Sequence, residues 1–182
     1  MLVKVMGDLG VSTFSVLSFI YSLVNAVLCG VSQGLQPLWG YCYGRRDSVE
    51  MNWYFRWGII INTISSVVIY ALLVLFDEPV INIFNSDAAL VDAAVKALPV
   101  FSISFIPMAV NLIYTAYFFS TKRTGEADVI AVSRGIILKA LAVFCIPMIF
   151  GGSSIWMAPF LAETVTFFIA IGLNKTNKLV YK

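Results

Sequence analysis

The sequence predicts an all-α integral membrane protein with five transmembrane helices. Hydrophobic residues make up 60% of the 182 positions and charged residues only 12%, against roughly 25% charged residues in a typical soluble domain. The mean hydropathy is +0.90. An uncharged run also extends from Leu9 to Gly44, although about 20 apolar residues suffice to cross a bilayer. We therefore expect residues 1–182 to form a single membrane domain.

Hydropathy along the chain divides it into five spans separated by polar connections. The first span is too long for one perpendicular crossing, so it must be tilted, bent or protruding. Prolines lie inside the third and fourth spans, and the fifth contains a single charged residue, Glu163. The expected spans are about 11–41, 53–76, 97–120, 129–150 and 155–173.

The connection before the third span has the pattern of a short amphipathic helix over about 86–96. Asn85, Ser86 and Asp87 offer an N-cap, and apolar residues follow at helical spacing. Such a helix would lie at the membrane interface or run directly into the third span. A plain loop is the alternative.

Basic residues alternate between the connections, as the positive-inside rule requires. They gather around the first and third connections and in the C-terminal tail, whereas the second connection carries four acidic residues against Lys96 alone. We expect a multi-pass protein of the cell membrane with its N-terminus outside and its C-terminus in the cytoplasm. Trp39, Trp53 and Trp57 should then lie near the inner interface and Trp156 near the outer one.

Composition argues against several other classes of protein. A net charge of +2 is too small for nucleic-acid binding, and no histidine is present to ligate a metal or act as a general base. The three cysteines are widely spaced in apolar segments, which favours buried hydrophobic roles over a disulfide or a metal site. The sequence contains no Walker motif and no plausible catalytic set, so we expect no enzyme, no metal and no cofactor.

Four segments, taken in order along the chain, are similar to a known family. They are the glycine-rich helix end 30–44 (Gly-Val-Ser-Gln-Gly-Leu-Gln-Pro-Leu-Trp-Gly-Tyr-Cys-Tyr-Gly), the connection 79–87, the pair 133–134 and the stretch 147–163. Together they resemble the C-terminal lobe of multidrug and toxic compound extrusion (MATE) transporters. That family has twelve helices in two lobes of six. The resemblance implies that the five spans are helices eight to twelve, a partial MATE-like helical bundle.

The resemblance also implies a function, the C-terminal part of a multidrug efflux antiporter that is coupled to sodium ions or protons and works by alternating access. Its partners would be the lipid bilayer, small cationic or amphipathic drug-like substrates and a missing N-terminal lobe. The acidic residue often tied to ion coupling in that lobe of the family has no counterpart here. Two alternatives stay open. One is a segment of a related flippase for lipid-linked sugars, and the other is a truncated, non-transporting membrane protein that needs a partner chain.

Glu163 is the first candidate for an ion or substrate pathway, because a carboxylate near a helix centre costs about 2.5–3.5 kcal/mol on insertion scales. It could bind a proton, a cation or a cationic drug, or it could form a structural ion pair. Lys139, about three turns into the fourth span, is its expected partner across the final hairpin. Arg134 is nearer the end of that span and is expected to reach the inner interface.

Side chains on two other spans are further candidates for the pathway. Gln33 and Gln36 share a helix face one turn before Pro37. Their amides could bind uncharged or cationic groups, or hydrogen-bond to another helix. Asn111 and Tyr114 are also three residues apart, and the Tyr114 ring could stack on a flat cation.

Glycines and prolines mark candidate hinges for a conformational change. Gly30 and Gly34 have the small-xxx-small spacing that also permits close helix packing. Pro37 and Pro107 each remove a backbone hydrogen-bond donor from a helix. We name Gly30, Gly34, Pro37 and Pro107 as hinge candidates, with close packing as the alternative for the glycines.

Overall fold

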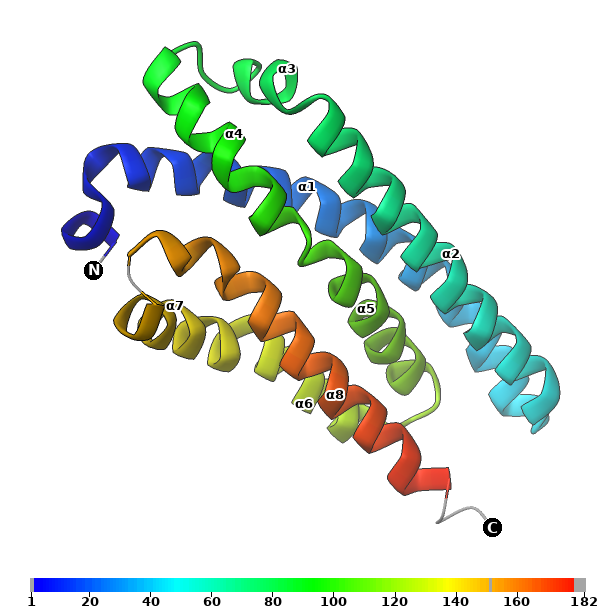
Figure 1. Cartoon of the computed structure of the whole chain (residues 1–182). Helices are drawn as coiled ribbons and strands as arrows, with labels where there is room; N and C mark the ends of the chain where they lie inside the picture. The colour runs from blue at the N-terminus through cyan, green and yellow to red at the C-terminus, as the bar shows by residue number, and fades with distance from the viewer. Residues whose placement is uncertain (1, 151, 179–182) are drawn as a thin grey trace.

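The computed structural model describes residues 2–150 and 152–178, which form a bundle of helices (Figure 1). Met1, Gly151 of the expected final hairpin and the tail residues 179–182 lie outside this description. In chain order the helices are α1 (Leu2–Arg45), α2 (Ser48–Leu75), α3 (Asp77–Asn82), α4 (Ala88–Ser102), α5 (Phe105–Ser120), α6 (Thr124–Val132), the π-helical turn η1 (Ser133–Ile137), α7 (Leu138–Phe150), the 3₁₀ segment η2 (Gly152–Met157) and α8 (Ala158–Lys178).

α1 is much longer than a bilayer is thick, as expected from its sequence. At 1.5 Å per residue the 39 residues from Gly7 to Arg45 measure about 58 Å. Gly7 has non-helical backbone angles (φ 67°, ψ −172°), so α1 is kinked near its start at a residue that tolerates positive φ. From there the helix runs to Arg45 and is not broken at Pro37.

α1 and α2 form an antiparallel hairpin that packs closely at one glycine. Asp47 caps α2 by accepting a hydrogen bond from the Glu50 backbone N–H at 3.0 Å. A Cβ atom at Gly58 would lie 2.7 Å from Leu35 Cδ1 and 3.4 Å from Trp39 Cζ2. The missing side chain therefore allows the two helices to approach.

The third span is a bent pair, α4 and α5, whose axes differ by 46° across a break at residues 103–104. Pro107 lies in the first turn of α5 and has no N–H to donate to the carbonyl of Ile103, which explains a break at this point. The segment 86–96 enters α4, which continues to Ser102 without an interruption at residue 96. This is the arrangement in which the amphipathic helix runs directly into the span, and it is preceded by the short helix α3, which we had not predicted.

α5 is the central helix of the bundle. It packs against α1, α2, α6 and α8, and 11 of its 16 residues are buried. Trp39 is fully buried beside it, with its ring edge-on to Tyr117 at 5.7 Å between centroids. Its side chain points into the contact between α1, α2 and α5, and its expected depth near the inner interface stays a prediction. Trp53 and Trp57 are exposed.

Within the described residues, four helical spans are long and apolar enough to cross a membrane, and the bent pair α4–α5 makes a fifth. The fold class predicted from the sequence is thus confirmed. Figure 1 shows the α1–α2 turn, the α5–α6 connection and the C-terminal end of α8 at one end of the bundle. The start of α1 and the α7–α8 connection lie at the other end.

Candidate functional site

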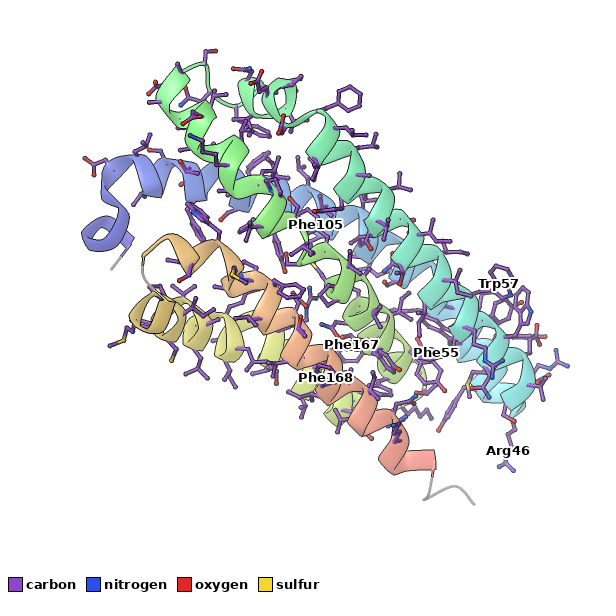
Figure 2. The ribbon with its side chains drawn as sticks, viewed as in Figure 1. Arg46, Phe55, Trp57, Phe105, Phe167 and Phe168 are labelled. Carbon is purple, nitrogen blue, oxygen red and sulfur yellow. The ribbon has the colours of Figure 1, made fainter. Side chains whose placement is uncertain are left out.

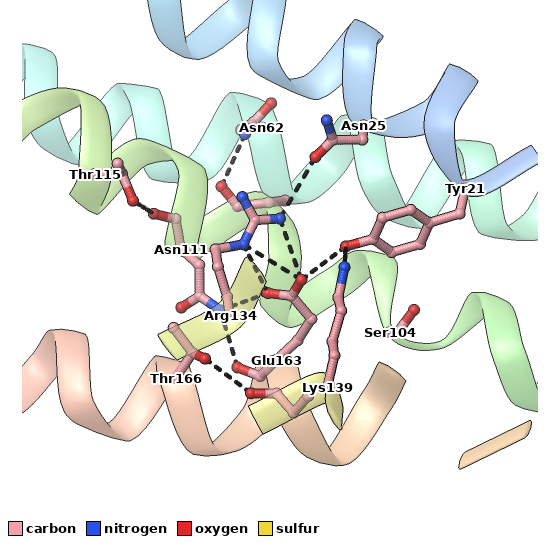
Figure 3. A network of polar contacts seen from close by, with 12 residues as sticks. Tyr21, Asn25, Asn62, Ser104, Asn111, Thr115, Arg134, Lys139, Glu163 and Thr166 are labelled. Atoms are coloured by element: carbon pink, nitrogen blue, oxygen red, sulfur yellow. Dashed lines mark hydrogen bonds and ion pairs between the residues drawn. The ribbon is translucent and has the colours of Figure 1, made fainter. Parts of the chain in front are cut away.

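The carboxylate of Glu163 is the centre of a buried polar cluster (Figure 3). Its side chain has no exposed surface. Arg134 Nη2 lies 3.1 Å from Glu163 Oε1, and Arg134 Nε lies 3.3 Å from both carboxylate oxygens. The Tyr21 hydroxyl donates to Oε1 at 2.8 Å, and Asn111 Nδ2 donates to Oε2 at 2.9 Å. Residues from α1, α5, η1 and α8 thus meet at one carboxylate.

Arg134 is the ion-pair partner of Glu163, so the expectation that it reaches the inner interface was wrong. Its side chain is only 13% exposed. Besides the carboxylate it contacts Asn25 Oδ1 on α1 at 3.4 Å. The guanidinium group suits this position because its several N–H donors can serve two acceptors in fixed geometry.

Lys139 is joined to Glu163 indirectly, through Tyr21. Lys139 Nζ donates to the Tyr21 hydroxyl oxygen at 2.8 Å and lies 4.2 Å from the centre of the Tyr21 ring. The expected direct pair between Lys139 and Glu163 is therefore absent, since Arg134 takes that place.

The π-helical turn η1 explains why both cations reach the cluster. Arg134 and Lys139 are five residues apart, and in a regular α-helix they would point about 140° away from each other. In η1 the Leu138 N–H bonds to the Ser133 carbonyl, the i→i+5 spacing of a π-turn. This wider turn brings residues five apart toward one face. Such turns are frequent at functional sites.

The cluster contains two cations and one carboxylate. Arg134 is neutralised by Glu163, whereas Lys139 has a hydroxyl and an aromatic ring as its partners. Lys139 also borders a cavity of about 250 Å³ whose walls come from α1, α4, α7 and α8. An anionic group or a dipole that enters this cavity would therefore meet a positive charge.

Asn111 belongs to the cluster, but Tyr114 does not. Asn111 is fully buried, and its amide donates both to the Glu163 carboxylate and to the Glu163 backbone carbonyl, the latter at 2.9 Å. Tyr114 lies on another side of α5 in an aromatic group with Phe55 and Phe118. The two residues share a helix but serve different contacts.

Gln33 and Gln36 lie away from the cluster, on a face of α1 that is open in this chain. Gln33 is exposed, and its amide lies 3.2 Å from Cys29 Sγ, while Gln36 is half-buried. Among residues 2–150 and 152–178, a Cβ atom added at Gly30 or Gly34 would meet no side chain and no other helix within 4 Å. Close packing within the described residues therefore does not account for these glycines, and their role as hinges stays a prediction.

Sequence reasoning missed Tyr21, Asn25 and a second buried amide, Asn62. Tyr21 and Asn25 are four residues apart in the first span, a spacing that puts both on one helix face. Asn62 on α2 is fully buried, and its amide donates to the Ala109 carbonyl on α5 at 2.8 Å. A lone amide inside an apolar span was the signal available for both asparagines.

Comparison with known proteins agrees with this architecture. The MatE family model matches residues 1–144. The chain is 22% identical over 161 residues to the multidrug export protein MepA of Staphylococcus saprophyticus, covering 87% of this chain and 35% of that protein. These matches favour neither the flippase nor the non-transporting alternative.

Two solved structures have the same fold as this chain. One is a multidrug resistance MATE family transporter of the MOP superfamily in an outward-facing conformation, with a TM-score of 0.89, 15% identity and coverage of 96% of this chain and 40% of that one. The other is also a multidrug resistance MATE family transporter of the MOP superfamily, in an inward-facing conformation. Its TM-score is 0.86 at 16% identity, and the match covers 96% of this chain and 41% of that one. The chain thus spans less than half the length of these relatives. Since the family model covers most of its residues, the chain belongs to the MATE family of membrane transporters.

Proposed function

We propose that this chain is the C-terminal part of a cation-coupled multidrug efflux antiporter. The observation that carries the proposal is the ion pair of Arg134 and Glu163, buried within a lobe of MATE fold. Ionisable groups inside a membrane are costly and commonly belong to ion pathways or proton relays. Membership of the family and the similarity to a multidrug export protein support the transport of drug-like, cationic or amphipathic substrates.

Coupling to an ion follows from the way in which the Glu163 oxygens are occupied. Both oxygens already accept hydrogen bonds from Arg134, and Tyr21 and Asn111 add one each. An arriving proton or sodium ion must therefore compete with these donors. Protonation would leave Arg134 buried without a counter-charge, a situation that costs several kcal/mol. The cluster would then rearrange, and the helices that meet there would shift.

Alternating access is the motion that such a rearrangement would drive. The fold of this chain resembles an outward-facing and an inward-facing transporter almost equally well, with TM-scores of 0.89 and 0.86. This similarity supports a lobe that moves largely as one body against the rest of the transporter. We infer that a second lobe covers the open face of α1 around Gln33 and Gly34 and supplies the remainder of the substrate cavity.

The basic end of the bundle supports the proposed orientation in the membrane. The α1–α2 turn, the α5–α6 connection and the end of α8 lie together (Figure 1), and all three are rich in arginine and lysine. The positive-inside rule puts this end in the cytoplasm and the start of α1 outside.

The test is a transport assay in liposomes that contain the purified full-length protein. Efflux of ethidium, a planar cation, is followed while an opposing sodium or proton gradient is imposed or collapsed. We expect efflux that depends on one gradient and is lost in Glu163→Gln, because the neutral amide cannot hold Arg134. The matched control is Glu126→Gln, a carboxylate that also pairs with an arginine but lies at the basic end. Efflux by Glu163→Gln that responds to the gradient as in the wild type would contradict the coupling role.

A further inference from the structure

A large cavity opens at the basic end of the bundle, away from the Glu163 cluster. Its volume is about 1260 Å³, and its walls come from the end of α1, the start of α2, the end of α5 with the connection that follows, and Asn174 of α8. Four basic residues line it, against one acidic residue, Asp47. The four are Arg46, Arg56, Lys122 and Arg123.

Three of these four cations have no partner within the part of the chain that the structure describes. Arg123 is engaged, since it pairs with Glu126 at 3.1 Å, donates to the Leu173 carbonyl at 3.0 Å and lies over the Phe118 ring. Arg46, Arg56 and Lys122 are exposed and form no ion pair among residues 2–150 and 152–178.

Asp47 forms no ion pair with these cations among the described residues, so three unpaired cations face one carboxylate. Asp47 Oδ1 accepts the Glu50 backbone N–H as the cap of α2. The cavity therefore has a strong positive charge and room for an anion.

The backbone holds two of the free cations at the cavity in unusual conformations. Arg46 and Lys122 both have φ of 58°, and they are the only non-glycine residues with positive φ in the described chain. Each follows the end of a helix, α1 or α5, where glycine is the residue most often found in this conformation. In both turns of this protein a basic residue occupies that position instead. The two turns thus present their charges to the same cavity from neighbouring helix ends.

The rest of the cavity has the character of a membrane interface. The wall beside the cations is less polar and includes Met51, Phe55 and Tyr117. Trp53 and Trp57, on the same stretch of α2, are 56% and 46% exposed. Figure 2 shows Arg46 at the tip of the α1–α2 hairpin, with Phe55 and Trp57 further along α2. Exposed tryptophans near the end of a span are typical of the headgroup level of a bilayer.

We propose that this cavity binds the headgroup of an anionic phospholipid from the adjacent membrane leaflet. The phosphodiester would lie among Arg46, Arg56 and Lys122, and the glycerol backbone would lie against Met51 and Phe55. Basic pockets between transmembrane helices on the cytoplasmic side suit such headgroups. A lipid fits better than a soluble anion because the apolar wall and the tryptophans lie beside the charges. This proposal does not depend on what the protein transports.

The test uses the purified full-length protein in detergent, with native mass spectrometry to count bound phosphatidylglycerol and phosphatidylcholine. We expect the wild type to retain phosphatidylglycerol in preference to phosphatidylcholine. Arg46→Gln/Lys122→Gln should bind phosphatidylglycerol at least about tenfold more weakly, since each cation removed lowers the electrostatic attraction to the anionic lipid. The matched control is Lys175→Gln, which removes a positive charge from the same end without touching the cavity wall. It should bind phosphatidylglycerol like the wild type.

Three outcomes would overturn the proposal. One is equal phosphatidylglycerol binding by the wild type and the double variant. Another is an equal loss in the double variant and in Lys175→Gln, which would indicate only general charge attraction. The third is full displacement of the lipid by an equal concentration of inorganic phosphate, which would indicate a soluble anion. If the double variant does not elute as folded protein, Arg56→Gln, on the exposed face of α2, is measured in its place.

Discussion

α5 makes a buried polar contact on each of two sides, and the two contacts differ in charge. Toward α2, the Asn62 amide donates to the Ala109 carbonyl, one turn after Gly58, where α2 packs closely on α1. Toward α8, Asn111 donates to Glu163, which in turn holds Arg134. We refer to these as the neutral contact and the ionic contact of α5.

This difference indicates which side of α5 can respond to an ion. The neutral contact does not change with proton concentration, because an amide and a carbonyl do not titrate, and it holds no charge that a cation would unpair. The ionic contact keeps its arrangement only while Glu163 is charged and free of other cations. We therefore expect variants of the ionic contact to change transport and variants of the neutral contact to change only stability.

The largest effect is expected from unpairing Arg134. Glu163→Gln should lower the free energy of unfolding by about 3–5 kcal/mol, because it leaves a buried cation without its partner. Arg134→Gln/Glu163→Gln should recover a large part of that loss, since both charges are then removed. Thermal unfolding of the purified protein in detergent measures both. The single variant Arg134→Gln completes the comparison. If the double variant is destabilised by the sum of the losses in Arg134→Gln and Glu163→Gln, the two side chains do not interact.

A smaller effect is expected from Tyr21→Phe, which keeps the ring below Lys139 but removes the hydroxyl between Lys139 and Glu163. Loss of a hydrogen bond to a charged group should cost about 1.5–3 kcal/mol and slow efflux several-fold. If Lys139 acts through this hydroxyl, Lys139→Gln should add little further loss of efflux in the Tyr21→Phe background. Fully additive losses in the efflux assay would contradict the bridge.

Gly58→Ala tests the packing of α2 against α1, one turn from the neutral contact, by crowding it. The new methyl group would press against Leu35 and Trp39, and overpacking of this kind costs about 1–3 kcal/mol, the lower figure applying because the Leu35 side chain can move. Gly34→Ala is the matched control, since its methyl group would meet no atom within 4 Å among the residues that the structure describes. We expect Gly34→Ala to leave the melting temperature unchanged. A Gly34→Ala variant that melts normally but transports poorly would locate the contact of Gly34 in another part of the transporter.

The smallest effect is expected from Asn62→Ala. Interhelical hydrogen bonds in membranes contribute about 0.6 kcal/mol on average, so the melting temperature should fall slightly while the rate of efflux is unchanged. Loss of efflux with normal stability would show that the neutral contact also takes part in transport. The distinction between the two contacts would then be wrong.

Parts of the site could be predicted from the sequence because charged and polar residues are rare in membrane spans, where burying them is costly. Glu163 and Asn111 stood out as polar groups inside apolar spans, and both lie in the cluster. Tyr21 carries no such signal, because an aromatic residue in a membrane helix is usually a packing residue. Gly30 and Gly34 have the spacing of close helix packing, yet Gly58, which has no such pattern around it, packs closely and those two do not among the described residues.

Composition and hydropathy alone determined the class of this protein, its helical spans and the residues most costly to bury, since these depend on local transfer energies. Only the tertiary structure decided which cation pairs with Glu163. Arg134 and Lys139 both lie within reach along the sequence, but the π-turn changes the rotation of the helix between them. The choice depends on how α7 and α8 turn against α1 and α5. Rotation of packed helices is set by contacts between distant residues, which no local pattern records.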